Sequence, residues 1–377
     1  MPKPIATCVL GVGLSGLTFH VPFLLALSDL FTLQSVLERN PTQEGGSVKQ
    51  RFGASVKIHR SFEAVIADPE IELIVIGTPN ETHYDFAKAA LLAGKHVLVD
   101  KPVTPTSVQA RELYDIARSK NLVLYAYQNR RWDSDFLALR KLLALPETSA
   151  QSIGTIIEFE SHFDRYRTVL KGTWKDEARP AAGLTYDLGA HLIDQALALF
   201  GRPDKITGFI QNLRGLGNPA VDDWFTIHLH YLTNSARPYP LTAILRANIL
   251  SARSSQLRYL VRGTRGSYIK YGVDVQEDQL KVIHAPGAIL ESHYGKEPDS
   301  LWGTVENLQG DGASFNRATW PSEDAGCYTD LFRNLAAAIR EGTDLLVPWK
   351  DAQTVIELIE LAQKSANEGK TVDVPPV

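Results

Sequence analysis

Three ionisable residues, Asp187, His191 and Asp194, fall close together in the mostly apolar stretch 186-YDLGAHLIDQ-195. In a helix, spacings of four and three residues place all three side chains on one face. Such a group could be an acid/base relay, in which a carboxylate orients the imidazole, or a metal site. It could also be two solvated acids beside an ordinary histidine. Other motifs in the sequence are needed to choose between these interpretations.

A second candidate is the glycine-rich run 11-GVGLSG-16, which matches G-x-G-x-x-G where an apolar strand should pass into a helix. Glycines at this spacing permit a tight turn, a close approach of the backbone to a pyrophosphate and close packing of helix on strand. The helix N-terminus adds N–H groups and the positive end of its dipole. The run predicts a dinucleotide site contacted by Gly11, Gly13, Leu14, Ser15 and Gly16.

Two neighbouring residues of opposite charge bear on which dinucleotide binds. Glu38 ends the second apolar run, 22 residues after Gly16, where a dinucleotide-binding fold places a carboxylate on the adenosine ribose. That carboxylate favours NAD because it would repel a 2′-phosphate. Arg39 could bind the phosphate of NADP if Glu38 turned away. NAD and NADP both stay open, and Glu38 slightly favours NAD.

A lysine follows a further apolar strand, in 94-GKHVLVDKPVT-104. The valine-rich strand ends at Asp100, so Lys101 should emerge at the carboxyl end of a parallel strand, the edge at which open α/β sheets bind ligands. There its ammonium group could hydrogen-bond a substrate hydroxyl and stabilise developing alkoxide charge. A lysine-proline pair at a strand end can also be only a turn.

Two arginines follow the next strand-like run, within 128-QNRRWDSDF-136. One arginine could fix a polyhydroxylated or acidic substrate, and Trp132 could stack on a sugar or nicotinamide ring. Alternatively, the arginines pair with Asp133, Asp135 or the acids of 160-ESHFD-164. Asn129 and Arg130 are candidates for cofactor contact, Arg131 and Trp132 for substrate contact, and His162, Asp164, Arg165, Arg167, Trp174 and Tyr186 for lining the site.

The elements that must position these residues change type along the chain. In the first third, β-branched runs alternate with helix-like segments such as 82–94, which predicts a parallel sheet covered on both faces. From about residue 154, strands with alternating polarity such as 225-FTIHLH-230 follow one another, which predicts an antiparallel sheet with one wetter face. The expected strands of the first third lie near 5–12, 31–38, 71–79 and 96–100, and closing helices are expected at 325–341 and 350–367.

The fold class is therefore α/β, with two domains. We expect a Rossmann NAD(P)-binding domain over residues 1–127 and a substrate-binding and oligomerisation α+β domain over 128–377 with a large, mostly antiparallel open sheet. The C-terminal helices either stay with the second domain or pack back on the first. The ligand site is expected in the cleft between the domains. His228 and His230 share one strand face, but no third ligand is evident beside them, so we predict no metal site.

Composition limits the partners. The formal net charge is −4 with acids and bases interspersed, which gives no basic face for nucleic acid or an anionic membrane. The N-terminus lacks the pattern of a signal peptide, and no apolar run approaches the length of a membrane span. The two cysteines, Cys8 and Cys327, suit a reducing, cytoplasmic compartment. A small molecule and a second copy of the chain are the expected partners.

Together these motifs resemble the glucose–fructose oxidoreductase/inositol dehydrogenase/MocA family. The resemblance adds 78-TPN-80 and His83, after the third clear strand, to the glycine run, to 94-GKHVLVDKP-102 and to the pair Asp187 and His191. Four longer segments resemble the branch of NADP-dependent scyllo-inositol dehydrogenase-like enzymes. They are 128-QNRRWDSDF-136, 160-ESHFDRYR-167, 186-YDLGAHLIDQ-195 and 263-GTRGSYIKYGVDVQEDQL-280.

The resemblance implies a dehydrogenase or reductase that moves a hydride between a nicotinamide and a CH–OH carbon of a sugar, polyol or inositol. Lys101 stands where the family has its catalytic lysine, and the bond before Pro102 is often cis there. Asp187 and His191 match the second acid/base pair, with His191 as proton acceptor. The resemblance also implies a homodimer or homotetramer formed through the C-terminal sheet, and cofactor contacts from Thr78, Pro79, Asn80, His83, Lys101 and Pro102.

Three positions depart from the family pattern. Asp100 replaces the glutamate of a Glu-Lys-Pro motif, Thr185 replaces a bulky aromatic residue, and Glu38 replaces a residue that is often small in NADP-using members. The last two leave substrate and cofactor preference open. The alternatives are a non-catalytic, dinucleotide-binding transcriptional regulator of the same fold, or a reductase of a specialised biosynthetic pathway. The presence of Lys101, Asp187 and His191 together favours the enzyme.

Overall fold

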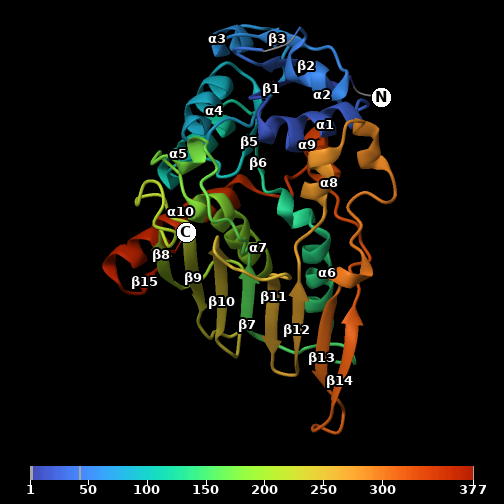
Figure 1. Ribbon diagram of the computed structural model, residues 1–377, viewed down its shortest axis with the longest axis vertical. Coiled ribbons are helices and arrows are strands. Elements are labelled where there is room, and N and C mark those ends of the chain that lie inside the picture. Colours follow the sequence, from blue (N-terminus) through green and yellow to red (C-terminus); the bar gives the residue numbers. More distant parts are fainter. Residues whose placement is uncertain (1–2, 42–43, 377) are drawn as a thin grey trace. The chain divides into compact units, whose positions relative to one another are not determined.

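The computed structural model describes residues 3–41 and 44–376, and the chain forms two compact units (Figure 1). The first unit takes in the chain up to Trp132, together with Val275–Gly295 and Cys327–Ile356. The second takes in Asp133–Asp274, Lys296–Gly326 and the chain from Glu357 onward. Each unit is thus assembled from segments that are far apart in the sequence.

The first unit is built on a six-stranded sheet in the order β3-β2-β1-β4-β5-β6, and all neighbouring strands are parallel. Every residue of the two central strands, β1 and β4, is buried, because helices cover both faces of a parallel sheet. The strands are β1 (Ile5–Leu10), β2 (Phe31–Leu37), β3 (Lys57–His59), β4 (Leu73–Ile76), β5 (His96–Asp100) and β6 (Leu124–Tyr127).

The helices of the first unit lie between its strands and in the two later segments. The best defined is α5 (Ser107–Ser119), which begins at a capping box formed by Thr106 and Gln109. The others are α1 (Val21–Ala26), α2 (Gly46–Phe52), α3 (Phe62–Ile66), α4 (His83–Leu92), α8 (Gln276–Val282) and α9 (Thr329–Glu341), while α10 (Trp349–Glu368) runs from the first unit into the second.

The second unit contains a nine-stranded sheet in the order β14-β13-β12-β11-β7-β10-β9-β8-β15. Its pairs are antiparallel except for β7 with β10, which are parallel and lie side by side in Figure 1. The strands are β7 (Ile156–His162), β8 (Lys205–Gln211), β9 (Trp224–Tyr231), β10 (Leu241–Asn248), β11 (Leu257–Gly263), β12 (Gly266–Tyr271), β13 (Gly303–Leu308), β14 (Phe315–Trp320) and β15 (Val372–Asp373).

One face of this second sheet is covered and the other is wetter. Burial alternates along β9 and β10, and α7 (Ala190–Phe200) packs on the covered face, where the Phe200 and Phe159 rings lie 5.3 Å apart. The remaining helix of this unit is α6 (Ser134–Leu143). His228 and His230 lie at half-buried positions of β9, alternating with its buried residues, and the His230 Nε2 atom is 2.8 Å from the Thr207 hydroxyl.

The predicted fold class is confirmed. The expected strands and closing helices lie close to their predicted ranges, whereas β3, β13, β14 and β15 were not predicted. The helix-like segment after the glycine run differs from a regular helix, because a π-helical turn at Gly16–His20 precedes α1. Among the residues that the structure describes, no helix is long and apolar enough to cross a membrane. The same residues include no group of three or more histidine, cysteine or acidic side chains arranged for a metal ion.

Candidate active site

The turn after β1 has the backbone geometry that the glycine run predicts. Gly11 has a φ of 87°, a left-handed conformation that suits glycine. A β-carbon on Gly16 would collide with the Gly11 carbonyl oxygen. At Gly13, by contrast, no described atom outside its immediate neighbours lies within 4 Å of where a β-carbon would be, and Leu14 is 67% exposed. The turn therefore leaves the Gly13 backbone open to a ligand such as a pyrophosphate.

A carboxylate ties this turn to the end of β5. The Ser15 hydroxyl donates to Asp100 Oδ2 at 2.5 Å, and His20 Nε2 lies 3.6 Å from the same oxygen. Burial disfavours the charged form of Asp100, but the contacts with His20, Lys101 and Ser15 outweigh it and hold the pKa of Asp100 below its usual range. Asp100 is therefore a carboxylate at neutral pH, and it holds the glycine turn beside the strand end that carries Lys101.

The loop after β5 is tied to the loop after β4. The Lys101-Pro102 peptide bond is cis, as the family resemblance implies. His83 Nδ1 lies 2.8 Å from the Pro102 carbonyl oxygen, and His83 Nε2 lies 2.8 Å from that of Thr78. Burial lowers the pKa of His83, against the opposing influence of Asp100 and the two carbonyls. A neutral imidazole has one N–H, so the ring donates to one carbonyl at a time. This gives His83 a positioning role, while its contact with the cofactor stays a prediction.

The Glu38 side chain is turned toward the start of α2. The Ser47 hydroxyl donates to Glu38 Oε1 at 2.6 Å, and the Ser47 N–H donates to Glu38 Oε2 at 3.1 Å. Glu38 is only 8% exposed, whereas Arg39 is exposed and its carbonyl oxygen accepts a hydrogen bond from Arg60 at 2.9 Å. Both carboxylate oxygens therefore have a protein donor, and the neighbouring guanidinium faces solvent.

The arginines after β6 have ion-pair partners that the sequence did not indicate. Asn129, Arg130, Arg131 and Trp132 form a short, buried helical turn. Arg130 pairs with Glu277 at 2.6 Å, and Arg131 pairs with Asp351 at 2.9 Å. Both acids come from later segments of the first unit, and neither was among the expected partners. The predicted contacts of these four residues with cofactor or substrate stay predictions.

In the second unit, Asp187 and His191 lie on either side of a change in helix type. A π-helical turn covers Thr185–Gly189, so Asp187 lies in that turn and His191 in the first turn of α7. Such turns are frequent at functional sites. The stretch is helical as predicted, and the π-helical turn within it was not. His191 is 5% exposed, and Asp194 on the following turn is also buried.

Two lysines accompany Asp187. Lys175 Nζ lies 3.0 Å from Asp187 Oδ1, and Lys171 Nζ lies 3.7 Å from Asp187 Oδ2. Burial lowers the pKa of Lys171 to about 8, and Lys175, Arg167 and Arg165 lower it further in opposition to Asp187. The acid of the predicted acid/base pair is thus a carboxylate in a strongly cationic environment.

The residues just before Asp187 are fixed by a second acid. The Thr185 N–H and hydroxyl donate to Asp222 Oδ2 at 2.7 and 2.8 Å. Thr185 is fully buried and anchors the π-helical turn, while its effect on the choice of substrate stays a prediction. Tyr186 is 6% exposed, and burial, together with Glu360 and Asp222, raises its pKa well above the usual value. Tyr186 is therefore an un-ionised phenol at neutral pH.

Two further predicted lining residues lie in the second unit. His162, at the end of β7, is 3.1 Å from Glu160 and 3.7 Å from Asp164. Burial opposes its charge, but these two carboxylates outweigh burial and raise the pKa of His162. Trp174 begins a short 3-10 turn, and the Lys175 ammonium lies over its ring at 5.6 Å. Their predicted contacts with the substrate stay predictions.

Sequence reasoning missed several residues of these two halves. The signal for the lysines was present in 165-RYRTVLKGTWK-175, a run of four cations close to the predicted acid/base pair. The Ser15–Asp100 and Ser47–Glu38 contacts had no sequence signal, because they join residues whose proximity depends on strand order and on the start of α2.

Two family models match the chain. The one described as "Oxidoreductase family, NAD-binding Rossmann fold" matches residues 5–128. The one described as "Oxidoreductase family, C-terminal alpha/beta domain" matches residues 149–374. Together they account for most of the sequence.

Individual proteins are similar over nearly the whole length. The chain is 42% identical over 375 residues to an uncharacterized oxidoreductase of Schizosaccharomyces pombe, covering 98% of each chain. It is 34% identical to the scyllo-inositol 2-dehydrogenase (NADP(+)) IolW of Bacillus subtilis, covering 97% of this chain and 94% of that protein. The solved structure of the oxidoreductase yvaA from Bacillus subtilis superposes with a TM-score of 0.88 at 33% identity and 99% coverage of both chains.

Proposed function

The chain belongs to the glucose–fructose oxidoreductase/inositol dehydrogenase/MocA family of NAD(P)-binding oxidoreductases, and we propose from this premise that it acts on a CH–OH carbon of a sugar, polyol or inositol. The nicotinamide, when bound, supplies the hydride acceptor or donor. The similarity to a scyllo-inositol 2-dehydrogenase supports a polyhydroxylated substrate.

The proposal assigns the proton chemistry to residues from both units. His191, at the start of α7, takes the hydroxyl proton during oxidation and returns it during reduction. We assign Asp187 the role of orienting that imidazole. Lys101 donates a hydrogen bond to the substrate oxygen and stabilises the negative charge that develops there.

One observation carries the proposal. Asp100 accepts a hydrogen bond from Ser15 of the glycine turn and is followed directly by Lys101. A turn built for a pyrophosphate and a lysine suited to a substrate oxygen are thereby held at the same edge of one sheet, where open parallel sheets bind ligands. The open space at Gly13 fits a dinucleotide at that edge.

The test is reduction of NAD or NADP in the presence of sugars, inositols and sugar acids, followed by the absorbance of the reduced nicotinamide. Lys101→Ala should remove turnover and leave dinucleotide binding nearly intact, while Lys120→Ala, an exposed lysine of the same unit, should resemble the wild type. Full activity of Lys101→Ala would end the assignment. Tight dinucleotide binding without turnover on any substrate would instead favour a non-catalytic regulator.

For the cofactor we propose a preference for NADP. A ribose 2′-hydroxyl would compete with Ser47 for Glu38, because Ser47 already donates to both oxygens of that carboxylate and leaves fewer lone pairs for a further donor. The exposed Arg39 is adjacent and offers a cation for a 2′-phosphate. The NADP-linked name of the Bacillus subtilis relative supports the same preference.

Two further proposals concern the setting in which the protein works. Free thiols at Cys8 and Cys327 suit a reducing compartment, so we propose a cytoplasmic location. The wetter face of the second sheet, which includes the half-buried positions of β9 and β10, is proposed as the interface of a homodimer or homotetramer. Light scattering during gel filtration measures the oligomeric state directly.

A further inference from the structure

We infer that the substrate carries an anionic group, a carboxylate or a phosphate, which binds a cationic cluster in the second unit. The cluster consists of Arg165, Arg167, Lys171 and Lys175. This inference rests on the proposed function, because it names the class of polyhydroxylated substrate. It also adds the cluster to the residues that determine specificity.

The two arginines of the cluster stand on backbone that is fixed to the second sheet. Beyond the end of β7 the chain continues alongside β10 and the residues that follow it. The Arg165 N–H donates to the Asn248 carbonyl oxygen at 2.8 Å, and the Arg167 N–H donates to that of Ile249 at 2.9 Å. A fixed backbone reduces the conformational entropy that is lost when side chains order around a ligand.

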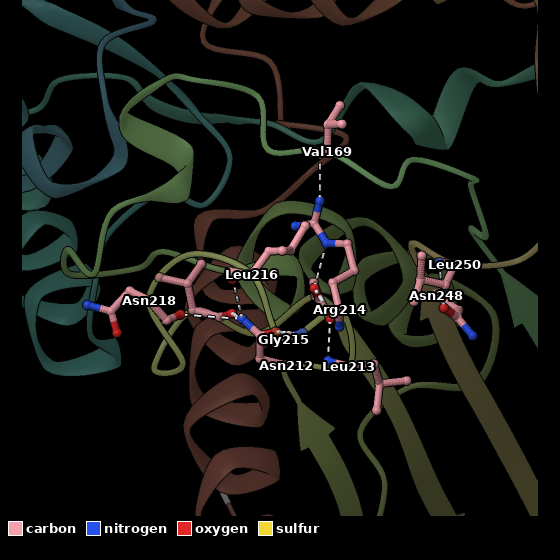
Figure 2. A network of polar contacts seen from close by, with 11 residues as sticks. Val169, Asn212, Leu213, Arg214, Gly215, Leu216, Asn218, Asn248 and Leu250 are labelled. Atoms are coloured by element: carbon pink, nitrogen blue, oxygen red, sulfur yellow. Dashed lines mark hydrogen bonds and ion pairs between the residues drawn. The ribbon is translucent and has the colours of Figure 1, made fainter.

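The loop between the arginines and the lysines is also anchored. Figure 2 shows Arg214 reaching from the segment after β8 to the Val169 carbonyl oxygen, to which its Nη1 atom donates at 2.8 Å. The same guanidinium pairs with Asp223 at 2.7 Å, and both side chains are less than a tenth exposed, at 7% and 5%. Arg214 is therefore a structural residue with its own counter-ion, and it holds the loop that leads to Lys171.

The cluster lies beside the proposed acid/base pair. Lys175 and Lys171 are 3.0 and 3.7 Å from the two oxygens of Asp187, four residues before His191. Lys175 belongs to the turn that Thr173 begins, since the Thr173 hydroxyl accepts a hydrogen bond from the Lys175 N–H. An anion bound here would therefore lie close to the residue that we propose handles the hydroxyl proton.

The cluster brings four positive charges close together. Asp187 and Asp176 both act on Arg167, Asp187 also lies beside Lys171 and Lys175, and Asp176 accepts a hydrogen bond from the Thr173 N–H. Burial, Arg214 and Arg165 lower the pKa of Arg167. The Arg167 Nε atom is buried and has no hydrogen-bond partner among the described residues. The like charges therefore repel one another, and one donor has no acceptor.

An anionic ligand would reduce the repulsion between the cations and supply the acceptor that the Arg167 Nε donor lacks. A carboxylate or phosphate supplies acceptor oxygens for guanidinium and ammonium donors, and its charge relieves the repulsion between them. A neutral cyclitol would supply acceptors without the compensating charge. The substrate class that fits is a polyhydroxylated acid or a sugar phosphate, with the reacting carbinol at His191 and the anion at the cluster.

The test compares binding of D-gluconate, D-glucose 6-phosphate and neutral D-glucitol to the full-length protein saturated with NADP+, by isothermal titration calorimetry. At least one of the two anions should bind about tenfold or more tightly than D-glucitol, and the stronger anion identifies carboxylate or phosphate as the preferred group. Lys171→Gln should weaken anion binding by about tenfold and D-glucitol binding by much less. Lys296→Gln, an exposed lysine of the same unit, is the matched control.

Two results would overturn the inference. One is D-glucitol binding as tightly as both anions, and the other is an anion preference that Lys171→Gln leaves intact. Neither result bears on the proposed function, which turnover of neutral polyols would still support. Conversely, tight anion binding without nicotinamide reduction on any substrate would contradict the proposed function and retain the anion site.

Discussion

The two sets of candidate residues, a first half that belongs to the first unit and a second half that belongs to the second, begin alike and differ in charge. Each has a π-helical turn at the start of its helix, Gly16–His20 in the first unit and Thr185–Gly189 in the second. In the first, Asp100 sits beside a serine hydroxyl and a histidine, and the backbone is left open at Gly13. In the second, Asp187 sits beside two lysines.

This difference in charge matches two different tasks, which are binding of the dinucleotide in the first half and selection of the substrate in the second. A pyrophosphate can be held by backbone N–H groups and a helix N-terminus, so the first half depends on glycine geometry more than on side-chain charge. A particular substrate must be selected by side chains, so the second half concentrates charge from a neighbouring loop. Variants that alter geometry should therefore affect the first half most, and variants that alter charge should affect the second.

The largest effect is expected at the glycine turn. Gly16→Ala should weaken dinucleotide binding by at least about a hundredfold, because the new β-carbon would collide with the Gly11 carbonyl and displace the turn. Gly13→Ala meets no such collision, so it should leave the melting temperature unchanged. It should still weaken dinucleotide binding, because the new methyl group would occupy the space that is open to the pyrophosphate. Fluorescence titration with NADPH and thermal unfolding check both. Equal melting temperatures for the two variants would show that the turn tolerates the change.

The two carboxylates should respond differently to neutralisation. Asp100→Asn should lower the free energy of unfolding by about 2 kcal/mol, because a neutral amide replaces the mostly buried carboxylate beside Ser15 and His20. Asp187→Asn, at a more exposed site, should cost about 1 kcal/mol or less but reduce turnover by about tenfold or more. Urea unfolding and steady-state rates provide the measurements. If Asp187→Asn lowered the free energy of unfolding as much as Asp100→Asn, the predicted difference between the two carboxylates would be wrong.

Titration of Lys171 should change substrate binding, which we assign to the second half, and should not change dinucleotide binding. Its pKa of about 8 means that the ammonium loses its proton as the pH rises through 8, so the KM for an anionic substrate should rise above that pH. Dinucleotide binding should stay constant over the same range. Lys171→Arg keeps the charge, so it should retain anion preference and remove the rise. A KM that is independent of pH in the wild type would contradict the role of Lys171.

The smallest effect is expected from Ser47→Ala, which removes the hydroxyl donor to Glu38 and leaves the N–H contact. The ratio of NADPH to NADH affinity should fall by about threefold, since the carboxylate becomes available to a ribose 2′-hydroxyl. The double variant Ser47→Ala/Glu38→Gln should not show that fall, because the competing carboxylate is gone. The measurement is the affinity of each variant for both dinucleotides. An unchanged ratio in Ser47→Ala would show that the Ser47 hydroxyl does not keep Glu38 from the ribose.

The fold and the first half were largely predictable from the sequence. The G-x-G-x-x-G run and the valine-rich strand before Lys101 are local signals, and each translates directly into backbone geometry at Gly11, Gly16 and the end of β5. The π-helical turns were not predictable, because residue spacing does not distinguish a π turn from an α turn. The orientation of Glu38 was missed for a related reason, since its position after β2 indicates a ribose contact while its side chain binds Ser47.

The second half was predictable only in part. Asp187 and His191 share a short motif, but their surroundings come from segments that strand pairing brings together, such as the extension of β7 along β10. Thr185 illustrates the limit. Its identity marks a departure from the family pattern, but nothing in the sequence indicated that its hydroxyl would bind Asp222, 37 residues later.

The central claim is hydride transfer to a carbon of a polyhydroxylated substrate, and isotope transfer tests it most directly. The protein would be incubated with reduced cofactor deuterated at C4 of the nicotinamide and with the keto or aldehyde forms of sugars, inositols and sugar acids. We predict deuterium on the carbinol carbon of at least one product by mass spectrometry, and none with Lys101→Ala although it still binds the cofactor. Cofactor binding by the wild type without deuterium in any product would contradict the account.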